Sequence, residues 1–402
     1  KDSPVHIYVD KAELTLSITA QDKPYDGDDK KLIVGKEIVV SDATDKHELT
    51  PLAEDGSNAA TADYMIVYPE DIRSAGTVKI TIVGLNNYVG TATKSYKIAP
   101  AKKAVTDFVV SVIDDNGNRV SKETAKLSYR AGGVTPKVNV TYDGDDLVPG
   151  KDYKVSYSGN KKVSTDKAKA KCTVTFLGNY KGTAKIVKEF EIVPAGIDAE
   201  SADVQVVSMD KVFVKAGKYE SAPIVTVDSV ALSKKDYDVK YTYTQDGKDV
   251  ELPKKLEESS LKDGALNVKV TVTGKGNYDS KTSAVGFYQI VKLPEKTDVN
   301  VYDLSKAKIV IRNKTTKSKV SSFTYTGNKI TIGEENELYV TLKVKGSKDP
   351  VELKEDEDFK VVYTNNVNKG KATIVLTGNG IDTVGSKTAT FSIAAQNLGT
   401  GK

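Results

Sequence analysis

Apolar and polar residues alternate along most of the chain, so that apolar side chains recur at every second position. The clearest runs are Val78, Ile80 and Ile82, then Val268, Val270 and Val272, then Ala372, Ile374 and Leu376. A period of two with one apolar face predicts antiparallel strands that are half exposed to water. Turn signals separate the runs at Asp26-Gly27, Asn116-Gly117, Asp143-Gly144 and Asp246-Gly247. One helix is expected over Leu252–Leu261, with Pro253 near its start and Gly264 beyond its end.

A motif of the form Asp-Tyr-x-Val-x-Tyr recurs along the chain. Its four copies begin at Asp63, Asp152, Asp236 and Asp358. An alternating strand, a Gly/Asn turn and a closing strand follow each copy. The isoleucines of the closing strands are Ile98, Ile192, Ile290 and Ile393, which lie 94, 98 and 103 residues apart. This period matches an Ig-like sandwich of about 100 residues and exceeds the roughly 20–50 residues of a solenoid or propeller unit.

Proline follows the closing strand of three copies, at Pro100, Pro194 and Pro294. Because proline restricts its own φ and the residue before it, these positions are expected to be short, stiff joints. The predicted fold is all-β, with four tandem Ig-like β-sandwich domains in an elongated array. The boundaries are 1–100 (repeat 1, with a long insertion at 41–62), 101–195 (repeat 2), 196–293 (repeat 3, with an insertion at 244–264 that holds the expected helix), 294–395 (repeat 4) and a tail at 396–402.

Further motifs surround the Asp-Tyr-x-Val-x-Tyr copies in a constant order. A Tyr-x-Gly opening occurs as Tyr25-Asp26-Gly27 and Tyr325-Thr326-Gly327, and in looser form at Tyr129–Gly132. A proline and a V-x-V strand follow, as in Pro136–Val140, and later come a Gly/Asn turn such as Gly274–Tyr278 and a closing aromatic-x-Ile. The series resembles the tandem bacterial Ig-like repeats of Gram-positive cell-surface proteins, over essentially the whole chain. This resemblance implies an extracellular location, at the cell surface or secreted, and a role as stalk, spacer or adhesin. It implies no ligand. Repeat 4 departs from the pattern at Asp382, which replaces the turn tyrosine.

Charge and composition exclude several functional classes. The 59 basic and 55 acidic residues are interspersed, and only four of the basic residues are arginines. Scattered lysine is typical of a solvated surface and of protected strand edges, whereas nucleic-acid binders concentrate positive charge, so we expect no nucleic-acid partner. Apolar runs stop well short of ~18 residues, so we expect no membrane insertion. A single cysteine excludes an intrachain disulfide and a cysteine-based zinc site.

Few residues are candidates for catalysis or metal binding. Cys172 occupies the register position of Ile80 and Val270, so it is expected to be an inert core residue. His6 and His47 have no companion ligand or nucleophile. We therefore predict no enzymatic activity, no catalytic residue, no cofactor and no metal.

Two other chemistries compete with a purely structural interpretation of the sequence. The Asp-Gly-Asp-Asp sequences at Asp26–Asp29 and Asp143–Asp146 could suit calcium, but they occupy different places in their repeats and are first of all turns. A Lys–Asn isopeptide crosslink resembles those of some Gram-positive adhesins, but the sequence selects no trio of lysine, asparagine and acid.

The 21 tyrosines could supply stacking platforms for sugars. Fifteen of them occupy five recurring positions: Tyr25, Tyr129 and Tyr325; Tyr64, Tyr153 and Tyr237; Tyr68, Tyr157, Tyr241 and Tyr363; Tyr88, Tyr180 and Tyr278; Tyr96 and Tyr288. Recurrence at equivalent positions predicts a structural role, with hydroxyls hydrogen-bonded inside the sandwich. The chain also has no tryptophan.

These features predict a non-enzymatic stalk or adhesin region, expected to be monomeric. Two alternatives are a module that recognises a host surface protein, host immunoglobulin or glycan through divergent loops, and an accessory region of a larger secreted glycan-degrading enzyme. Binding is expected in the insertions, chiefly 46–62, 244–264 and 333–357, since loops on a rigid scaffold carry function. Repeat 2 is then the plainest spacer, and removal of 248–262 should leave repeat 3 folded.

Overall fold

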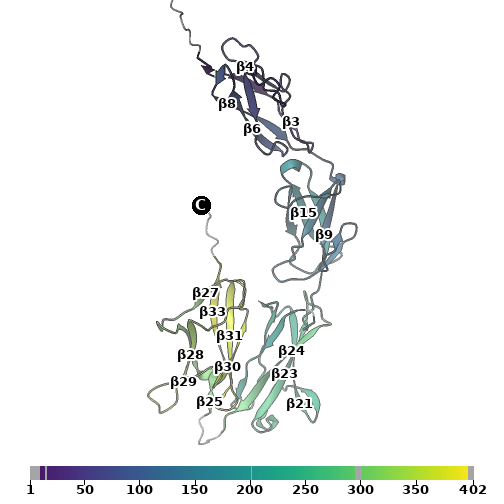
Figure 1. The fold of residues 1–402 in the computed structure, drawn as a ribbon. Coiled ribbons are helices and arrows are strands. Elements are labelled where there is room, and N and C mark those ends of the chain that lie inside the picture. Colours follow the sequence, from purple (N-terminus) through teal and green to yellow (C-terminus); the bar gives the residue numbers. More distant parts are fainter. Residues whose placement is uncertain (1–9, 14–15, 201, 295–300, 397–402) are drawn as a thin grey trace, which may run out of the picture. The chain divides into compact units, whose positions relative to one another are not determined.

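The protein is described here by a computed structural model, which covers residues 10–13, 16–200, 202–294 and 301–396. Strands dominate, and the described part of the chain contains no α-helix. Its helical residues form four short 3-10 turns, at Val105–Asp107, Gly178–Tyr180, Glu258–Ser260 and Leu304–Lys306. The all-β class is therefore confirmed. The chain divides into two compact units: unit 1 comprises 1–127, 135–160 and 164–191, and unit 2 comprises 128–134, 161–163 and 192–402. Figure 1 shows the strands of the described residues along the chain.

Repeat 1 contains one four-stranded sheet and a smaller strand pair. The sheet has the order β3-β8-β6-β5, formed by Lys23–Pro24, Thr91–Ala99, Gly76–Gly84 and Tyr64–Val67. The pair joins Leu16–Ala20 (β2) with Ile38–Asp42 (β4), and short β1 (Ala12–Glu13) runs parallel to β7 (Tyr88–Val89). The core takes residues from both layers, including Ile38 and Val40 of β4 and Ile80 and Ile82 of β6.

Repeat 2 contains two four-stranded sheets. The first has the order β10-β9-β12-β13, formed by Arg119–Val120, Phe108–Ile113, Val138–Tyr142 and Asp145–Asp146. The second has the order β11-β16-β15-β14, formed by Ala125–Ser128, Ile186–Val193, Ala170–Phe176 and Tyr153–Ser158. Among the described strands, β14 pairs only with β15, and on its other side a single isolated bridge joins Tyr153 to Pro149. Strand β14 is thus an edge strand of its sheet.

Repeat 3 contains a three-stranded and a five-stranded sheet. The smaller has the order β17-β19-β20, formed by Val204–Val207, Ile224–Val227 and Val230–Ala231. The larger has the order β18-β24-β23-β21-β22, formed by Lys211–Phe213, Ser283–Lys292, Ala265–Gly274, Tyr237–Gln245 and Lys248–Glu251. Its fifth strand, β22, comes from the insertion and pairs with the end of β21 through an Asp246-Gly247 turn.

Repeat 4 contains a three-stranded and a four-stranded sheet. The first has the order β26-β28-β29, formed by Lys308–Asn313, Asn336–Leu342 and Val351–Leu353. The second has the order β27-β33-β31-β30, formed by Ser322–Thr324, Ser386–Ala394, Gly370–Gly378 and Phe359–Thr364. Short β25 (Tyr302–Asp303) runs parallel to β32 (Thr383–Val384).

The recurring sequence positions are recurring core positions. The first aromatic residue of each Asp-Tyr-x-Val-x-Tyr copy is buried, as are the four closing isoleucines. The buried aromatics are Tyr64, Tyr153, Tyr237 and Phe359. Alternation along each strand places these side chains on one face, which packs against the second sheet of the same repeat.

Cys172 lies on β15 and is completely buried, as its register predicts. Its neighbours across the strands are Tyr157 of β14 and Lys188 of β16. Burial raises the pKa of the thiol, so the nucleophilic thiolate is disfavoured as well as inaccessible.

The insertions differ from their prediction in three places. The expected helix over Leu252–Leu261 is wrong: the chain there follows strand β22 and forms only the 3-10 turn at Glu258–Ser260. In the same insertion Leu252 and Leu256 are buried in the core of repeat 3, so this segment is not a dispensable surface loop. The stretch 333–357 of repeat 4 is not a loop either, because it contains β28, the central strand of its sheet.

Repeat 1 shows the same behaviour. Leu49, within the insertion 41–62, is buried in the core, and its N–H donates to Val40 O at 2.9 Å. The sequence analysis did not expect an apolar residue within a polar, loop-like segment to enter the core. A single leucine among polar residues carries no periodicity, yet it can fill an opening between two sheets.

We expect Cys172 to react with a thiol reagent only when repeat 2 unfolds, because the folded chain leaves its sulfur no access to solvent. The measurement is the labelling rate in buffer and in rising denaturant. Fast labelling of the folded protein would contradict the assigned register.

We expect Leu256→Ala to destabilise repeat 3 by about 2–5 kcal/mol, since it removes a fully buried aliphatic side chain. The matched control is Lys255→Ala, whose side chain is mostly exposed and should change stability little. Urea unfolding of the full chain measures both. Equal midpoints for the two variants would show that the insertion is a surface loop after all.

We expect Tyr64→Phe and Tyr153→Phe to differ in stability, although both tyrosines are buried at equivalent positions. The Tyr153 hydroxyl donates to Val138 O at 2.8 Å, so its loss should cost about 1 kcal/mol. The Tyr64 hydroxyl is buried with no partner among the described residues, so its removal should be neutral or stabilising. Thermal unfolding of both variants decides the point, and a larger loss for Tyr64→Phe would be the contrary result.

Candidate functional site

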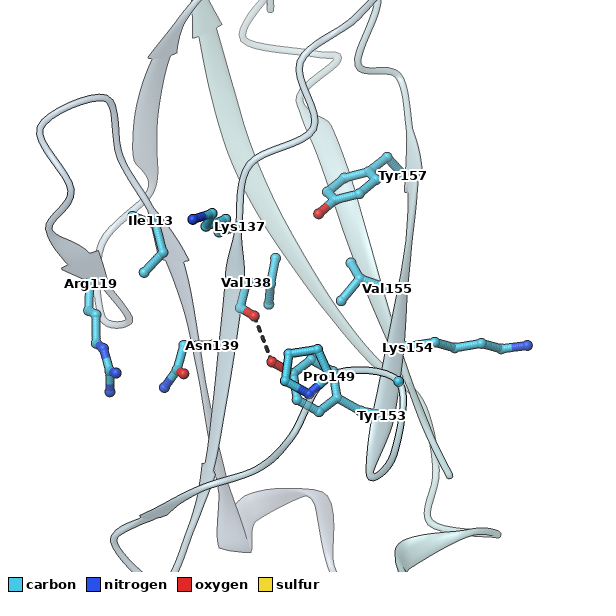
Figure 2. Close-up of a pocket in the computed structure, with 11 residues that line it drawn as sticks. Ile113, Arg119, Lys137, Val138, Asn139, Pro149, Tyr153, Lys154, Val155 and Tyr157 are labelled. Atoms are coloured by element: carbon cyan, nitrogen blue, oxygen red, sulfur yellow. Dashed lines mark hydrogen bonds between the residues drawn. The ribbon is translucent and has the colours of Figure 1, made fainter. Parts of the chain in front are cut away.

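A cavity lies in repeat 2, along the open side of its sandwich. It is a groove of about 670 Å³ between edge strand β14 and strand β12 (Figure 2). The alternating strand pattern of β14 determines which side chains enter it. Tyr153, Val155 and Tyr157 point toward β12, whereas Lys154 points away. A groove of this size is within the range of pockets that bind small molecules or peptide side chains.

Two tyrosine hydroxyls join the sheets along this groove. Tyr153 donates to Val138 O at 2.8 Å, and Tyr157 donates to the carbonyl of Pro136. Burial raises the pKa of Tyr157 to about 12, so its hydroxyl stays protonated and remains a donor. Both acceptors belong to the segment that enters β12. The tyrosines therefore hold the groove at a set width.

The ends of the groove are held by different groups. At one end, Arg119 forms a two-pronged ion pair with Asp146, with N–O distances of 2.9 and 2.7 Å, and Asn139 Nδ2 donates to the same carboxylate. At the other end, Gly150 N–H donates to Tyr153 O at 2.8 Å. The side chain of Asp146 is thus committed within the fold. The charged residues that line the groove are all basic: Arg119, Lys137 and Lys154.

The backbone of β14 offers hydrogen-bonding groups on its free side. The Asp152 carbonyl faces β15, since it accepts the Leu177 N–H at 2.7 Å, whereas the Tyr153 carbonyl faces the groove side. Successive residues of a strand direct their backbone groups to opposite sides. The N–H and C=O groups of Val155 and Tyr157 therefore point to the unpaired edge, beside the groove.

The same corner recurs in repeats 1 and 4. The Tyr68 hydroxyl accepts from Leu32 N at 3.0 Å, and the Tyr363 hydroxyl accepts from Ile332 N at 3.1 Å. Repeat 1 also has a hollow of about 520 Å³ beside β5, with Lys31 and Glu54 in its lining. Those two side chains pair with each other at 2.8 Å, so the repeat 1 hollow has balanced charge.

Repeat 3 fills the corresponding corner with its own chain. The Tyr241 carbonyl, equivalent to that of Tyr157, accepts the Leu252 N–H at 3.0 Å. Leu252 and Leu256 are buried there, and Leu256 bridges to Gly217. An extended segment with apolar side chains is therefore the occupant that this architecture already accepts at that edge.

The candidate residues from the sequence lie in different environments in the structure. Cys172 lies in the core, as predicted, and His6 falls outside the described residues. His47 is exposed, with Nδ1 2.5 Å from Asp45 Oδ1 and Nε2 3.3 Å from the Tyr88 hydroxyl. The Asp45 carboxylate accepts a hydrogen bond from the imidazole and so raises the pKa of His47 above its usual value. The sequence alone did not indicate this series of hydrogen bonds, because Tyr88 lies 41 residues beyond His47.

The two Asp-Gly turns are not equivalent, as predicted, but they come together. Asp143 and Gly144 have positive φ and close the hairpin between β12 and β13. Asp26 instead pairs with Lys30. Within unit 1 both turns line one pocket of about 290 Å³, which also contains Lys103. No group of three or more histidine, cysteine or acidic residues in the described part of the chain is placed to hold a metal ion.

Sequence reasoning did not single out the groove residues Arg119, Lys137 and Pro149. The sequence does contain the two walls of the groove. The proline and V-x-V strand form one wall, and the Asp-Tyr-x-Val-x-Tyr copy that follows them forms the other. What was missing is the pairing order of the strands. Only that order shows that β14 is an edge and that the space beside it is open.

Comparison with known proteins assigns no family. No family description matches the chain, and no curated protein matches it. Among solved structures, the protocadherin gamma B4 extracellular domain shares 9% identity at a TM-score of 0.20, over 94% of this chain and 65% of that one. Cadherin domains 1–4 of protocadherin gamma B7 share 11% identity at a TM-score of 0.20, over 93% of this chain and all of that one. The chain thus spans slightly under two thirds of the first structure. At these TM-scores the likenesses carry no conclusion about fold or function.

Proposed function

We propose that the chain is a non-enzymatic region of a bacterial cell-surface or secreted protein, acting as a stalk or adhesive ectodomain. Its four repeats would form four Ig-like sandwiches in an elongated array, with boundaries near residues 100, 195 and 293. The array would be monomeric and extracellular, and its partner would be a host surface protein, a host immunoglobulin or a glycan.

One observation carries this proposal: the same tyrosine-held corner is rebuilt in three of the repeats, namely 1, 2 and 4. Tyr68, Tyr157 and Tyr363 each bond the backbone of the segment that enters the opposite sheet. Their neighbours on the same strand are buried at equivalent positions. A chain that repeats one structural solution gains length and rigidity, which is the requirement for a stalk.

A binding role within such an array is favoured by the groove of repeat 2. Its lining combines half-buried apolar residues, unpaired backbone groups and basic side chains. That combination suits recognition of a polypeptide better than a purely spacing role. It also reverses the expectation that repeat 2 is the plainest spacer.

We expect small-angle X-ray scattering to give a length on the order of 120–160 Å, from four modules of roughly 25–35 Å. The radius of gyration should then clearly exceed the ~21 Å of a compact 400-residue globule. The control is a two-repeat fragment, residues 1–195, whose length should be about half. A full-chain value near that of the globule would contradict the elongated array.

A further inference from the structure

We propose that the groove of repeat 2 binds an extended, acidic and aliphatic peptide segment of a partner protein by strand addition to β14. The inference rests on the proposed non-enzymatic binding role and names the chemistry of the partner. The segment would pair its backbone with Val155 and Tyr157 and place an aliphatic side chain between β14 and β12.

The backbone of β14 supports this mode of binding. The outward N–H and C=O groups of Val155 and Tyr157 lie on an edge that no strand of the described part of the chain covers. Strand addition uses such groups for affinity and uses adjacent hollows for side-chain specificity. Here the hollow adjoins the same two residues, so both requirements meet at one place.

Repeat 3 supplies the template for the occupant. Its segment 250–256 crosses the equivalent edge, with Leu252 N–H bonded to the Tyr241 carbonyl. Leu252 and Leu256 are then buried against the same strand face. The equivalent position in repeat 2 has no such segment, and the space is open. A peptide segment added to repeat 2 would therefore pack as segment 250–256 already packs on the equivalent edge of repeat 3.

Charge determines the polar character of the occupant. The side chains of Arg119 and Lys137 lie beside the groove, whereas Lys154 projects from the other face of β14, and Arg119 is already paired with Asp146. Lys137 and Lys154 are exposed and are left to attract acidic side chains that flank the aliphatic anchor. The hollow of repeat 1 lacks this bias, because its lysine and glutamate neutralise each other.

A synthetic peptide that copies residues 248–257, with its three lysines replaced by glutamate, is the probe. It is titrated against the full chain by calorimetry, and amide exchange is measured with and without it. A second peptide keeps the three lysines and serves as the charge control. The chain is tested as wild type and as Val155→Pro, Val155→Thr, Lys137→Glu and Lys126→Glu.

Val155→Pro removes the outward N–H at an edge position where proline is compatible with a strand. It should weaken binding of the acidic peptide at least about tenfold, the effect of losing one or two backbone hydrogen bonds. Val155→Thr keeps the N–H and the branched shape, so it should bind the peptide more tightly than Val155→Pro does. Lys137→Glu should weaken binding, whereas Lys126→Glu on β11, the opposite edge of the same sheet, should not. The amides of Val155 and Tyr157 should exchange more slowly with peptide bound.

Several results would overturn the proposal. The first is that the acidic peptide does not bind at millimolar concentration. The second is that Val155→Pro has a normal melting temperature and binds the peptide as tightly as the wild type. The third is that the lysine peptide binds more tightly than the acidic one. Self-association that Val155→Pro abolishes would assign the edge to a second copy instead. If Val155→Pro fails to fold, the proposal is still tested by the peptide affinities of Lys137→Glu and Lys126→Glu and by the amide exchange of the wild type. A compact scattering profile with peptide binding intact would contradict only the elongated array. An extended profile without binding would contradict only the groove proposal.

Discussion

The open side of a two-sheet sandwich must be held at a set width, and in repeat 2 two tyrosines of one strand perform this task. Tyr153 and Tyr157 reach from β14 to the carbonyls of Val138 and Pro136. Buried hydroxyls need partners, and in repeat 2 the two backbone carbonyls at the entrance of the facing strand supply them. The groove, its basic rim and its unpaired edge all depend on this spacing.

The four repeats treat that opening differently, and the differences follow from local chain content. Repeat 3 covers it with a segment of its own insertion and buries two leucines there. Repeat 1 lines it with Lys31 and Glu54, which pair with each other. Repeat 2 has no described strand equivalent to β22 and leaves the edge of β14 uncovered. Exposed edges are normally protected against unwanted pairing, so lysine at Lys154 both shields this edge and biases what can approach it.

The alternation of side chains along each strand also determines which residues are buried in the core and which are exposed. Cys172 and the closing isoleucines have inward register and are buried, while the intervening lysines are exposed. The insertions do not follow this rule. Leu49, Leu252 and Leu256 enter the core from segments with no strand periodicity, so these segments are part of the packing rather than loops added to it.

Periodicity and repetition in the sequence by themselves determined the all-β class, the recurring positions and the inward place of Cys172, because a strand side chain has only two faces to choose between. They did not determine the helix content of 244–264 or the central strand within 333–357, since isolated apolar residues and short strands leave no clear period. Nor could they place His47 beside Tyr88, or the turn at Asp26 beside the turn at Asp143. Those neighbours, and the free edge beside the groove, follow from strand order and sheet packing. Contacts between residues far apart in the chain exist only once the tertiary structure has formed.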